Sequence, residues 1–270
     1  MGAGKATAAE LAILNAVQRM ANTLFVGKVY HRFDELPSTN DYARELLAKS
    51  KPPEGAVVRA ASQSAGRGQF GSRWLAEAGA NLTLSVVFYP NGLSVDTQFR
   101  LSEAMALAVR DTVAPWLDDA EVWVKWPNDI YIGPHKTAGI LIQNTLQGQS
   151  LQASVVGIGL NVNQMDFPPE LPNATSMARA AGKSFDLEAV AECLLECLEQ
   201  RYLQLRAGQF AALRDEYHAR LLGRGEMRRF ARPDGGEFRG VIRGVREDGQ
   251  LAVLVEGVEM LFAVKSVRML

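Results

Sequence analysis

Residues 122–162 read VWVKWPNDIYIGPHKTAGILIQNTLQGQSLQASVVGIGLNV and carry four segments with the composition of β-strands. β-Branched and apolar residues dominate 122–126, 130–132, 137–143 and 151–162, with Pro, Asn and Gly between them. Short turns such as Gly133-Pro134-His135 join the last three segments, so they are predicted to form an antiparallel meander. Two more strands are predicted over 56–61 and 82–88.

Helical periodicity occurs in segments separate from those strands. Ser38 and Asp41 form an S-x-x-D capping box, and Pro52 ends the helix that this box begins. Further helices are predicted over 8–24, 96–117, 186–208 and 210–221. Because strands and helices are segregated along the chain, the pattern favours an α+β fold over a doubly wound one.

The sequence pattern changes after Gly223. Short alternating strands are predicted over 238–242, 251–255 and 259–264, with Gly-containing turns between them and no helical stretch. This pattern predicts a small β-barrel packed on the main domain. The expected organisation is therefore a helical extension over 1–28, a main domain over 29–222 and a barrel over 223–270.

The composition excludes several classes of protein. The chain has 270 residues, 47% of them apolar, and 29 Lys and Arg against 30 Asp and Glu leave a net charge of −1. This balance argues against a basic nucleic-acid-binding protein, and no apolar run is long enough to cross a membrane. Cys193 and Cys197 are the only cysteines, so a disulfide framework is excluded and core packing is expected for both. A cytoplasmic location is expected.

A glycine-rich loop carries the first functional signal. Residues 66–71 read GRGQFG and match the G-x-G-x-x-G pattern of dinucleotide-binding folds, but that pattern requires a helix directly after it. Here Arg73 and Trp74 lead into another strand. The glycines let backbone N–H groups approach an anion beside Arg67 and Arg73, and Trp74 offers a flat face for a base. A phosphate-bearing, purine-like ligand fits this loop; the alternative is a surface turn with solvated arginines.

Two short motifs place charged side chains at strand ends. Lys125-Trp126-Pro127-Asn128-Asp129 closes one strand, and His135-Lys136-Thr137-Ala138-Gly139 opens the next but one. The small residues after Lys136 let the backbone approach a ligand while the ammonium reaches a carboxylate or phosphate, so Lys136 is the strongest candidate for stabilising phosphoryl transfer. Asp129 either orients Lys136 or caps a turn.

Residues 157–163 read GIGLNVN and form the last motif. Gly157 and Gly159 interrupt a predicted strand, which often marks the close approach of a ligand. Strand alternation points Asn161 and Asn163 to one face, where they serve either a ligand or a bulged edge.

Signatures of metal and covalent catalysis are missing. The three histidines are scattered, and the sequence contains neither H-E-x-x-H nor G-x-S-x-G. No metal site built by the protein alone is expected, and the chemistry need not pass through a covalent enzyme intermediate.

Taken in order, these motifs resemble those of biotin protein ligases. The resemblance runs from about Tyr30 to the end of the chain and rests on Ser38-Thr39-Asn40, Gln63 with 66–74, 125–129, 136–139 and 157–163. It implies a catalytic domain related to class II aminoacyl-tRNA synthetases and lipoate ligases, with a mixed and mostly antiparallel sheet. A small SH3-like barrel is implied after it.

The resemblance also implies a reaction with two steps. The carboxylate of biotin attacks the α-phosphate of ATP, which arrives with Mg²⁺, to give biotinyl-AMP and pyrophosphate. A lysine of a biotin carrier domain, of the acetyl-CoA carboxylase type, then attacks this anhydride. Lys136 and Arg67 are the implied catalytic residues, because cations there offset charge repulsion as the anions meet.

Binding residues are implied by the same resemblance. Ser38, Thr39, Gln63 and the backbone near Gly66 would bind the ureido ring, while Trp74 would stack on adenine and Asn161 would read its edge. The full biotin set is Ser38, Thr39, Asn40, Gln63, Gly66, Arg67, Gly68, Gln69, Lys136, Gly139, Gly157 and Gly159. The full nucleotide set is Arg67, Arg73, Trp74, Asn128, Asp129, Lys136, Asn161 and Asn163.

Two departures from the family pattern affect these expectations. Gln69 stands where some relatives carry Arg, which bears on how tightly the adenylate is retained. Only 29 residues precede Tyr30, where bifunctional members carry a winged helix-turn-helix, so no nucleic-acid partner is expected. Lipoate attachment and a non-enzymatic sensor are the alternative functions, and the oligomeric state is left open between monomer and homodimer.

Overall fold

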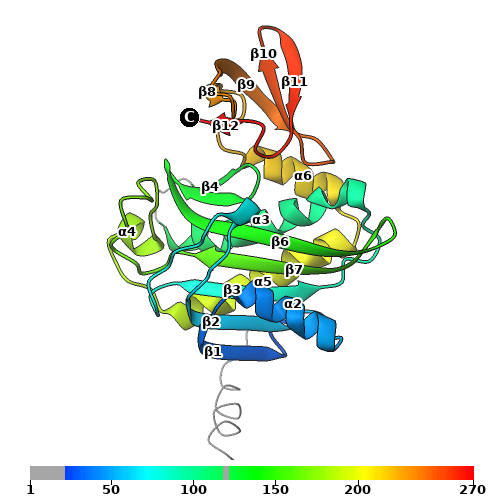
Figure 1. Ribbon diagram of the computed structural model, residues 1–270, viewed down its shortest axis with the longest axis vertical. Helices are drawn as coiled ribbons and strands as arrows, with labels where there is room; N and C mark the ends of the chain where they lie inside the picture. The colour runs from blue at the N-terminus through cyan, green and yellow to red at the C-terminus, as the bar shows by residue number, and fades with distance from the viewer. Residues whose placement is uncertain (1–21, 118–121) are drawn as a thin grey trace, which may run out of the picture.

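The computed structural model describes residues 22–117 and 122–270, and its largest element is a seven-stranded mixed sheet (Figure 1). The strand order is β1-β2-β3-β7-β6-β5-β4, and only β1 and β2 are parallel. The predicted meander is confirmed, since β4 to β7 pair in sequence and antiparallel. The strands are β1 (Tyr30–Leu36), β2 (Val57–Gln63), β3 (Leu82–Phe88), β4 (Val122–Lys125), β5 (Asp129–Ile132), β6 (His135–Gln147) and β7 (Ser150–Leu160).

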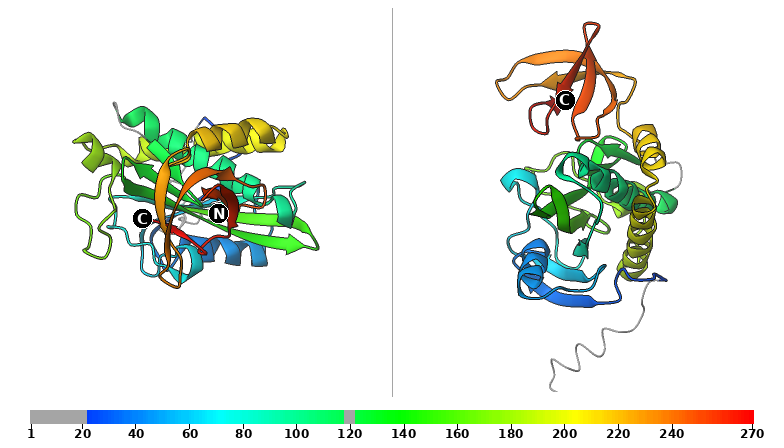
Figure 2. Two further views of the ribbon diagram at one scale, coloured as in Figure 1. Left: turned by 90° about the horizontal axis from the view of Figure 1, so that it is seen from above. Right: turned by 90° about the vertical axis from the view of Figure 1, so that its right-hand side faces the viewer.

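Helices cover both faces of this sheet (Figure 2). α3 and α5 pack on one face, where they bury the main hydrophobic core, and α2 packs on the other face against β2, β3 and β7. Because both faces of β3 are covered, its seven residues are all buried. The helices are α2 (Thr39–Lys49), α3 (Phe99–Val113), α4 (Met177–Ala181), α5 (Leu187–Arg206) and α6 (Phe210–Ala219), with 3₁₀ turns η1 (Gln69–Gly71), η2 (Val95–Thr97) and η3 (Ala114–Trp116).

The predicted helix ends follow local chemistry. The Ser38 side chain accepts the N–H of Asp41 and begins α2, which confirms the predicted cap, but the Asp41 carboxylate pairs with Arg67 and does not complete the capping box. The helix expected from residue 96 begins at Phe99, because a 3₁₀ turn over Val95–Thr97 precedes it. The helix expected over 8–24 falls almost entirely outside the described residues, and 22–24 have no helical structure. In the described part of the chain, no helix has the length and apolarity of a membrane span.

The C-terminal residues form a second, antiparallel sheet above one end of the first (Figure 1). Its order is β11-β10-β9-β8-β12, and stacked rings of Phe230, Phe238 and Phe262 pack inside it. The expected closed barrel is corrected: within 223–270 the two end strands do not pair, because β12 has only two residues and both pair with β8. The strands are β8 (Met227–Ala231), β9 (Glu237–Val245), β10 (Leu251–Val255), β11 (Val258–Phe262) and β12 (Arg268–Met269).

The turn between β9 and β10 holds the two sheets together. The indole N–H of Trp126 donates to the carbonyl of Gly249 at 2.9 Å. Arg214 on α6 bridges Glu247 of this turn, at 2.8 Å, and the buried Glu103 of α3, at 3.8 Å. The turn is therefore joined to the 125–129 motif by a hydrogen bond and to α6 and α3 by ion pairs.

Glu103 makes this junction sensitive to pH. Burial raises the pKa of Glu103 to about 7, although Arg214 and Arg100 oppose the shift. A carboxyl whose pKa is raised by folding adds stability at low pH and loses it as pH rises through the folded pKa. Glutamine does not ionise, so the Glu103→Gln variant does not lose this stability. We expect its free energy of unfolding, relative to that of the parent protein, to rise by about 2 kcal/mol from about pH 5 to about pH 8. Urea unfolding at both pH values tests this, with substitution of the exposed Glu45 by Gln as the control. The expectation is wrong if the difference in free energy of unfolding between variant and parent is the same at both pH values.

Candidate active site

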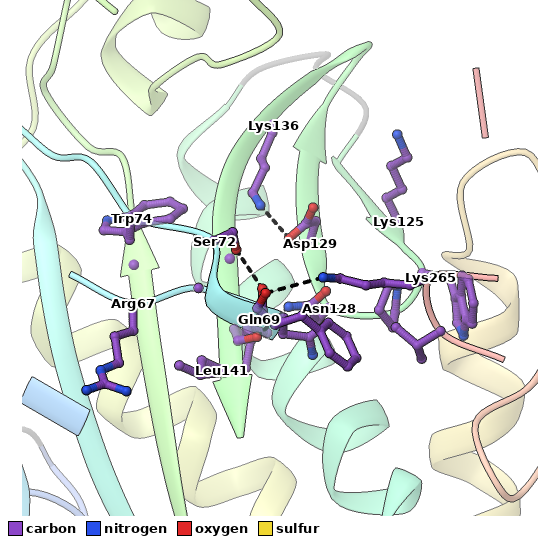
Figure 3. Close-up of a pocket in the computed structure, with 18 of the residues that line it drawn as sticks. Arg67, Gln69, Ser72, Trp74, Lys125, Asn128, Asp129, Lys136, Leu141 and Lys265 are labelled. Carbon is purple, nitrogen blue, oxygen red and sulfur yellow. Dashed lines mark hydrogen bonds and ion pairs between the residues drawn. The ribbon is translucent and has the colours of Figure 1, made fainter. Parts of the chain in front are cut away.

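A cavity of about 740 Å³ opens between the 66–74 loop, the α2 face of the main sheet and the C-terminal sheet (Figure 3). Most of the site residues predicted from sequence line it: Ser38, Thr39, Asn40, Gln63, Arg67, Gly68, Gln69, Arg73, Trp74, Asn128, Asp129, Lys136, Gly139, Gly157 and Gly159. They come from the four strands β2, β5, β6 and β7, the start of α2, the 66–74 loop and the turn before β5. The fold thus brings the separated motifs to one place.

A hydrogen-bonded polar cluster forms one part of the wall. The backbone N–H of Thr39 donates to Oε1 of Gln63 at 2.8 Å, and the Thr39 hydroxyl donates to the same oxygen at 3.2 Å. The Ser85 hydroxyl donates to Oδ1 of Asn40 at 2.6 Å, while the Asn40 amide donates to Oε1 of Gln143 at 3.0 Å. These side chains are held in place before any ligand arrives, which favours recognition of a polar, uncharged group.

Two glycines of β7 make room for side chains that form the wall. A Cβ atom at Gly157 would overlap Oδ1 of Asn40, and one at Gly159 would overlap the indole of Trp74. The sequence indicated close approach of a ligand at both glycines. The structure instead shows the side chains of Asn40 and Trp74 lying directly on the strand.

Lys136 lies near Trp74, and Asp129 holds it in place. Its Nζ is 2.6 Å from Oδ1 of Asp129 and 5.8 Å from the Trp74 ring centroid, with the Lys136 side chain 33% exposed. Of the two roles left open for Asp129, this ion pair supports orientation of Lys136. The Asn128 amide donates to the carbonyl of Ile140 at 2.6 Å, which fixes the turn that carries Asp129.

A β-bulge turns Lys136 toward the cavity. Opposite β5, Ala138 pairs with Ile130 and Lys136 pairs with Tyr131, so Thr137 is an extra residue in β6. Thr137 and Ala138 are consequently both fully buried, although they are neighbours in a strand. Beyond the bulge, Lys136 shares the side of Gly139 instead of the core side of Ala138.

The glycine loop forms a small hairpin over the cavity. Trp74 N–H donates to the carbonyl of Gly66 at 3.0 Å, and Gly68 N–H donates to the carbonyl of Ser72 at 2.7 Å. Nε of Arg67 lies 2.7 Å from Oδ2 of Asp41, and the Arg67 side chain points away from Lys136 (Figure 3). The two expected catalytic cations therefore line one cavity but do not point at one spot in this structure.

Three predicted residues lie outside the cavity wall. The Asn161 amide donates to the carbonyl of Thr175 at 3.0 Å, and its buried Oδ1 has no hydrogen-bond partner. Asn163 exchanges two hydrogen bonds with the backbone of Phe185, so it secures the connection that follows β7. Gly66 is buried beneath Trp74, where it closes the loop hairpin.

The structure adds cavity residues that the sequence did not single out. They are Phe70, Lys265 and Arg268. Ser85 and Asp41 do not line the cavity themselves but contact residues that do, since Ser85 donates to Asn40 and Asp41 pairs with Arg67. Ser85 had a signal, since it is a polar residue inside the apolar strand sequence LTLSVVF. Lys265 and Arg268 had none, because their position depends on how the C-terminal sheet packs.

Electrostatics of the cavity are dominated by lysine and arginine. Burial lowers the pKa of Lys125, which lies 4.9 Å from the Tyr131 ring, and Asp129 partly opposes that shift. Among the described residues, no three His, Cys, Asp or Glu side chains gather in a manner suited to a metal ion. Cys193 and Cys197 lie on α5 and take no part in the cavity wall. The cavity therefore suits an anionic ligand with an uncharged polar end.

Comparisons with known proteins show which class of protein has this fold and these motifs. The sequence model of the Biotin/lipoate A/B protein ligase family matches residues 32–161. A Mycobacterium tuberculosis protein named biotin–[acetyl-CoA-carboxylase] ligase is 35% identical over 86% of this chain and 86% of its own length. The Bacillus subtilis bifunctional ligase/repressor BirA is 33% identical over 87% of this chain and 72% of its own length. The chain belongs to the biotin protein ligase family.

A solved structure shares the whole fold. The biotin protein ligase of Aquifex aeolicus, solved with biotin and ATP, superposes with a TM-score of 0.75. The match covers 90% of this chain and 99% of that one, at 23% sequence identity. The likeness extends over both sheets, so the open C-terminal sheet is part of the biotin protein ligase fold.

Proposed function

We propose that the protein is an ATP-dependent biotin protein ligase that biotinylates a carrier domain of the acetyl-CoA carboxylase type. In the first step a carboxylate oxygen of biotin bonds to the α-phosphorus of ATP, and the bond to the bridging oxygen breaks to release pyrophosphate. In the second step a carrier lysine amine attacks the carbonyl carbon, AMP leaves, and the amine loses a proton as the amide forms. The observation that supports this function most strongly is the ion pair between Lys136 and Asp129, in the same cavity as the glycine loop and the polar cluster.

The polar cluster supports a place for the ureido ring of biotin. Ser38, Thr39 and Gln63 lie where α2 begins and β2 ends, and their amide and hydroxyl groups match the donors and acceptors of a cyclic urea. Gly139, Leu141 and Ile158 line the cavity along β6 and β7, and Leu141 would be an apolar contact for the alkyl chain. Biotin bound this way extends its carboxylate toward Lys136.

The nucleotide would lie beneath the glycine loop. Lys136 offsets the negative charge that develops when the carboxylate meets the α-phosphate, and Asp129 holds its ammonium in place. Arg67 would join it when its ion pair with Asp41 opens, while Trp74 would stack on the adenine. Mg²⁺ would enter bound to the phosphates of ATP, as a part of the substrate.

Biotin-dependent exchange of labelled pyrophosphate into ATP tests this function directly. A ligase exchanges label only when biotin is present, whereas a binding sensor exchanges none. Adding lipoate in competition separates the biotin ligases from their lipoate relatives, because a lipoate ligase would adenylate lipoate in preference. Transfer to a purified carrier domain then tests the second step.

The residue at position 69 is expected to affect the rate at which biotinyl-AMP leaves the enzyme. Its side chain lines the cavity and carries no charge, whereas some relatives have Arg at this position. We expect Gln69→Arg to slow the release of biotinyl-AMP by about two- to fivefold, because a guanidinium there adds an exposed contact to phosphate. Release can be followed from preformed enzyme–adenylate by rapid filtration. Equal release rates for the variant and the parent protein would refute this expectation.

The remaining assignments are also proposals. The division into a catalytic part over 29–222 and a C-terminal part over 223–270 is supported by the two separate sheets. β1 is an end strand of the main sheet, so its outer edge offers main-chain groups to a second subunit or to a carrier strand. At the other end of the sheet, Val124 of β4 already bonds to the backbone of Arg220 and Leu222. We infer a cytoplasmic monomer or homodimer that acts without nucleic acid.

A further inference from the structure

Lys265 joins the C-terminal sheet to the tip of the glycine loop. It lies in the connection between β11 and β12, and its Nζ donates to the carbonyl of Phe70 at 3.3 Å (Figure 3). The same ammonium lies 4.4 Å from the centroid of the Phe70 ring. Both residues line the mouth of the cavity, 195 positions apart in the chain.

Both partners have an unusual backbone conformation. Phe70 has φ = 55° and Lys265 has φ = 68°, values that residues with a side chain rarely adopt. Such strain persists only where the surroundings hold it, and it gathers at ligand clamps. Phe70 is 62% exposed, so packing in a core does not compensate for its strain. The Lys265 ammonium supplies a compensating contact to the Phe70 ring and carbonyl.

We propose that Lys265 is a positioning residue that holds the 66–74 loop over the cavity and thereby slows loss of the adenylate. This inference rests on the proposed function for its consequence, but the contact itself does not depend on it. Loop closure excludes water from the labile anhydride, so a contact that keeps the loop over the cavity lengthens the life of the intermediate. Lys265 acts on the loop and not on the reacting atoms.

Trypsin tests the loop contact without any substrate. Arg67 and Arg73 are cleavage sites on either side of Phe70, and neither is changed by substitution at Lys265. We expect Lys265→Met to be cleaved at these two sites about two- to fivefold faster, as loss of an exposed cation–π contact predicts. Lys265→Arg should stay close to the parent protein because it restores the cation. Lys183→Met is the matched control, since Lys183 also lies over a phenylalanine ring but outside the cavity.

The rate of adenylate release tests the consequence. Lys265→Met should release biotinyl-AMP about two- to fivefold faster, and Lys265→Arg should release it at the rate of the parent protein. Phe70→Leu should release it faster in the parent protein and have little further effect in Lys265→Met, because the two residues act as one contact.

The trypsin and release experiments together decide whether the proposal holds. Unchanged cleavage and unchanged release in Lys265→Met, or fully additive effects of the two substitutions, would overturn it. If the parent protein fails to exchange pyrophosphate, the proposed function is wrong, and the trypsin rates still decide whether Lys265 holds the loop. Faster cleavage of Lys265→Met, with parent-like cleavage of Lys265→Arg, supports the contact whether or not the parent protein exchanges pyrophosphate.

Discussion

Lys136→Gln is expected to lower the rate of biotin-dependent pyrophosphate exchange by about 10²- to 10³-fold. The Lys136 ammonium is held at 2.6 Å from Asp129, on the cavity side of β6. Glutamine keeps most of the side-chain length but cannot offset the charge that develops on the α-phosphate. Because that charge is greatest in the transition state, kcat should fall by more than the affinity for biotin.

Two further variants make this experiment specific. Lys49→Gln removes an exposed lysine on α2 that does not line the cavity, so its exchange rate should match that of the parent protein. Asp129→Asn leaves the cation in place but removes its partner, and a smaller loss is expected. A Lys136→Gln enzyme with full exchange activity would show that the cation does not act on the reaction.

Gly157→Ala is expected to lower the free energy of unfolding by about 2–3 kcal/mol, because it displaces the buried Asn40 from its hydrogen bonds. The added Cβ atom would overlap Oδ1 of Asn40 and lie 2.7 Å from its Cγ. Asn40 is only 4% exposed and is fixed by Ser85, Gln143 and the carbonyl of Leu141, so it has no free space to enter. The polar cluster should move with it, and the KM for biotin should rise by about tenfold or more.

A double-mutant cycle separates this clash from a general effect on β7. In an Asn40→Ala background the obstructing amide is absent, so Gly157→Ala should cost little stability there. Urea unfolding of the four proteins gives the coupling energy, and the KM for biotin is measured on the same set. Equal costs of Gly157→Ala in both backgrounds would show that Asn40 is not the reason for the glycine.

Most of the residues that the motifs predicted for the site line one cavity, whereas Gly66, Asn161 and Asn163 do not. Local signals such as the Ser38 cap and the short turns of the meander were also confirmed, because they depend on neighbours in the chain. Strand alternation predicted that Asn161 and Asn163 point to one face, and the resemblance to biotin protein ligases implied that they bind the nucleotide. Neither lines the cavity, because the chain leaves β7 at Leu160 and both amides hold the connection that follows.

The C-terminal part was predicted less well. Alternating residues with Gly turns predicted several short strands, and five are present in residues 223–270. Closure into a barrel depends on pairing between the two end strands, which local alternation does not encode. Lys265 was missed for the same reason, since its contact with Phe70 spans 195 residues of sequence.

By itself, the sequence determined the strands, the capped helix and the set of polar and glycine residues from which the site is made. These features follow from turn chemistry and periodicity within a few residues. The tertiary structure decided where the charges point. Alternation alone would place Lys136 on the core side with Ala138, but the extra residue Thr137 turns it toward the cavity. A bulge forms through pairing with another strand, so its effect on Lys136 exists only in the assembled sheet.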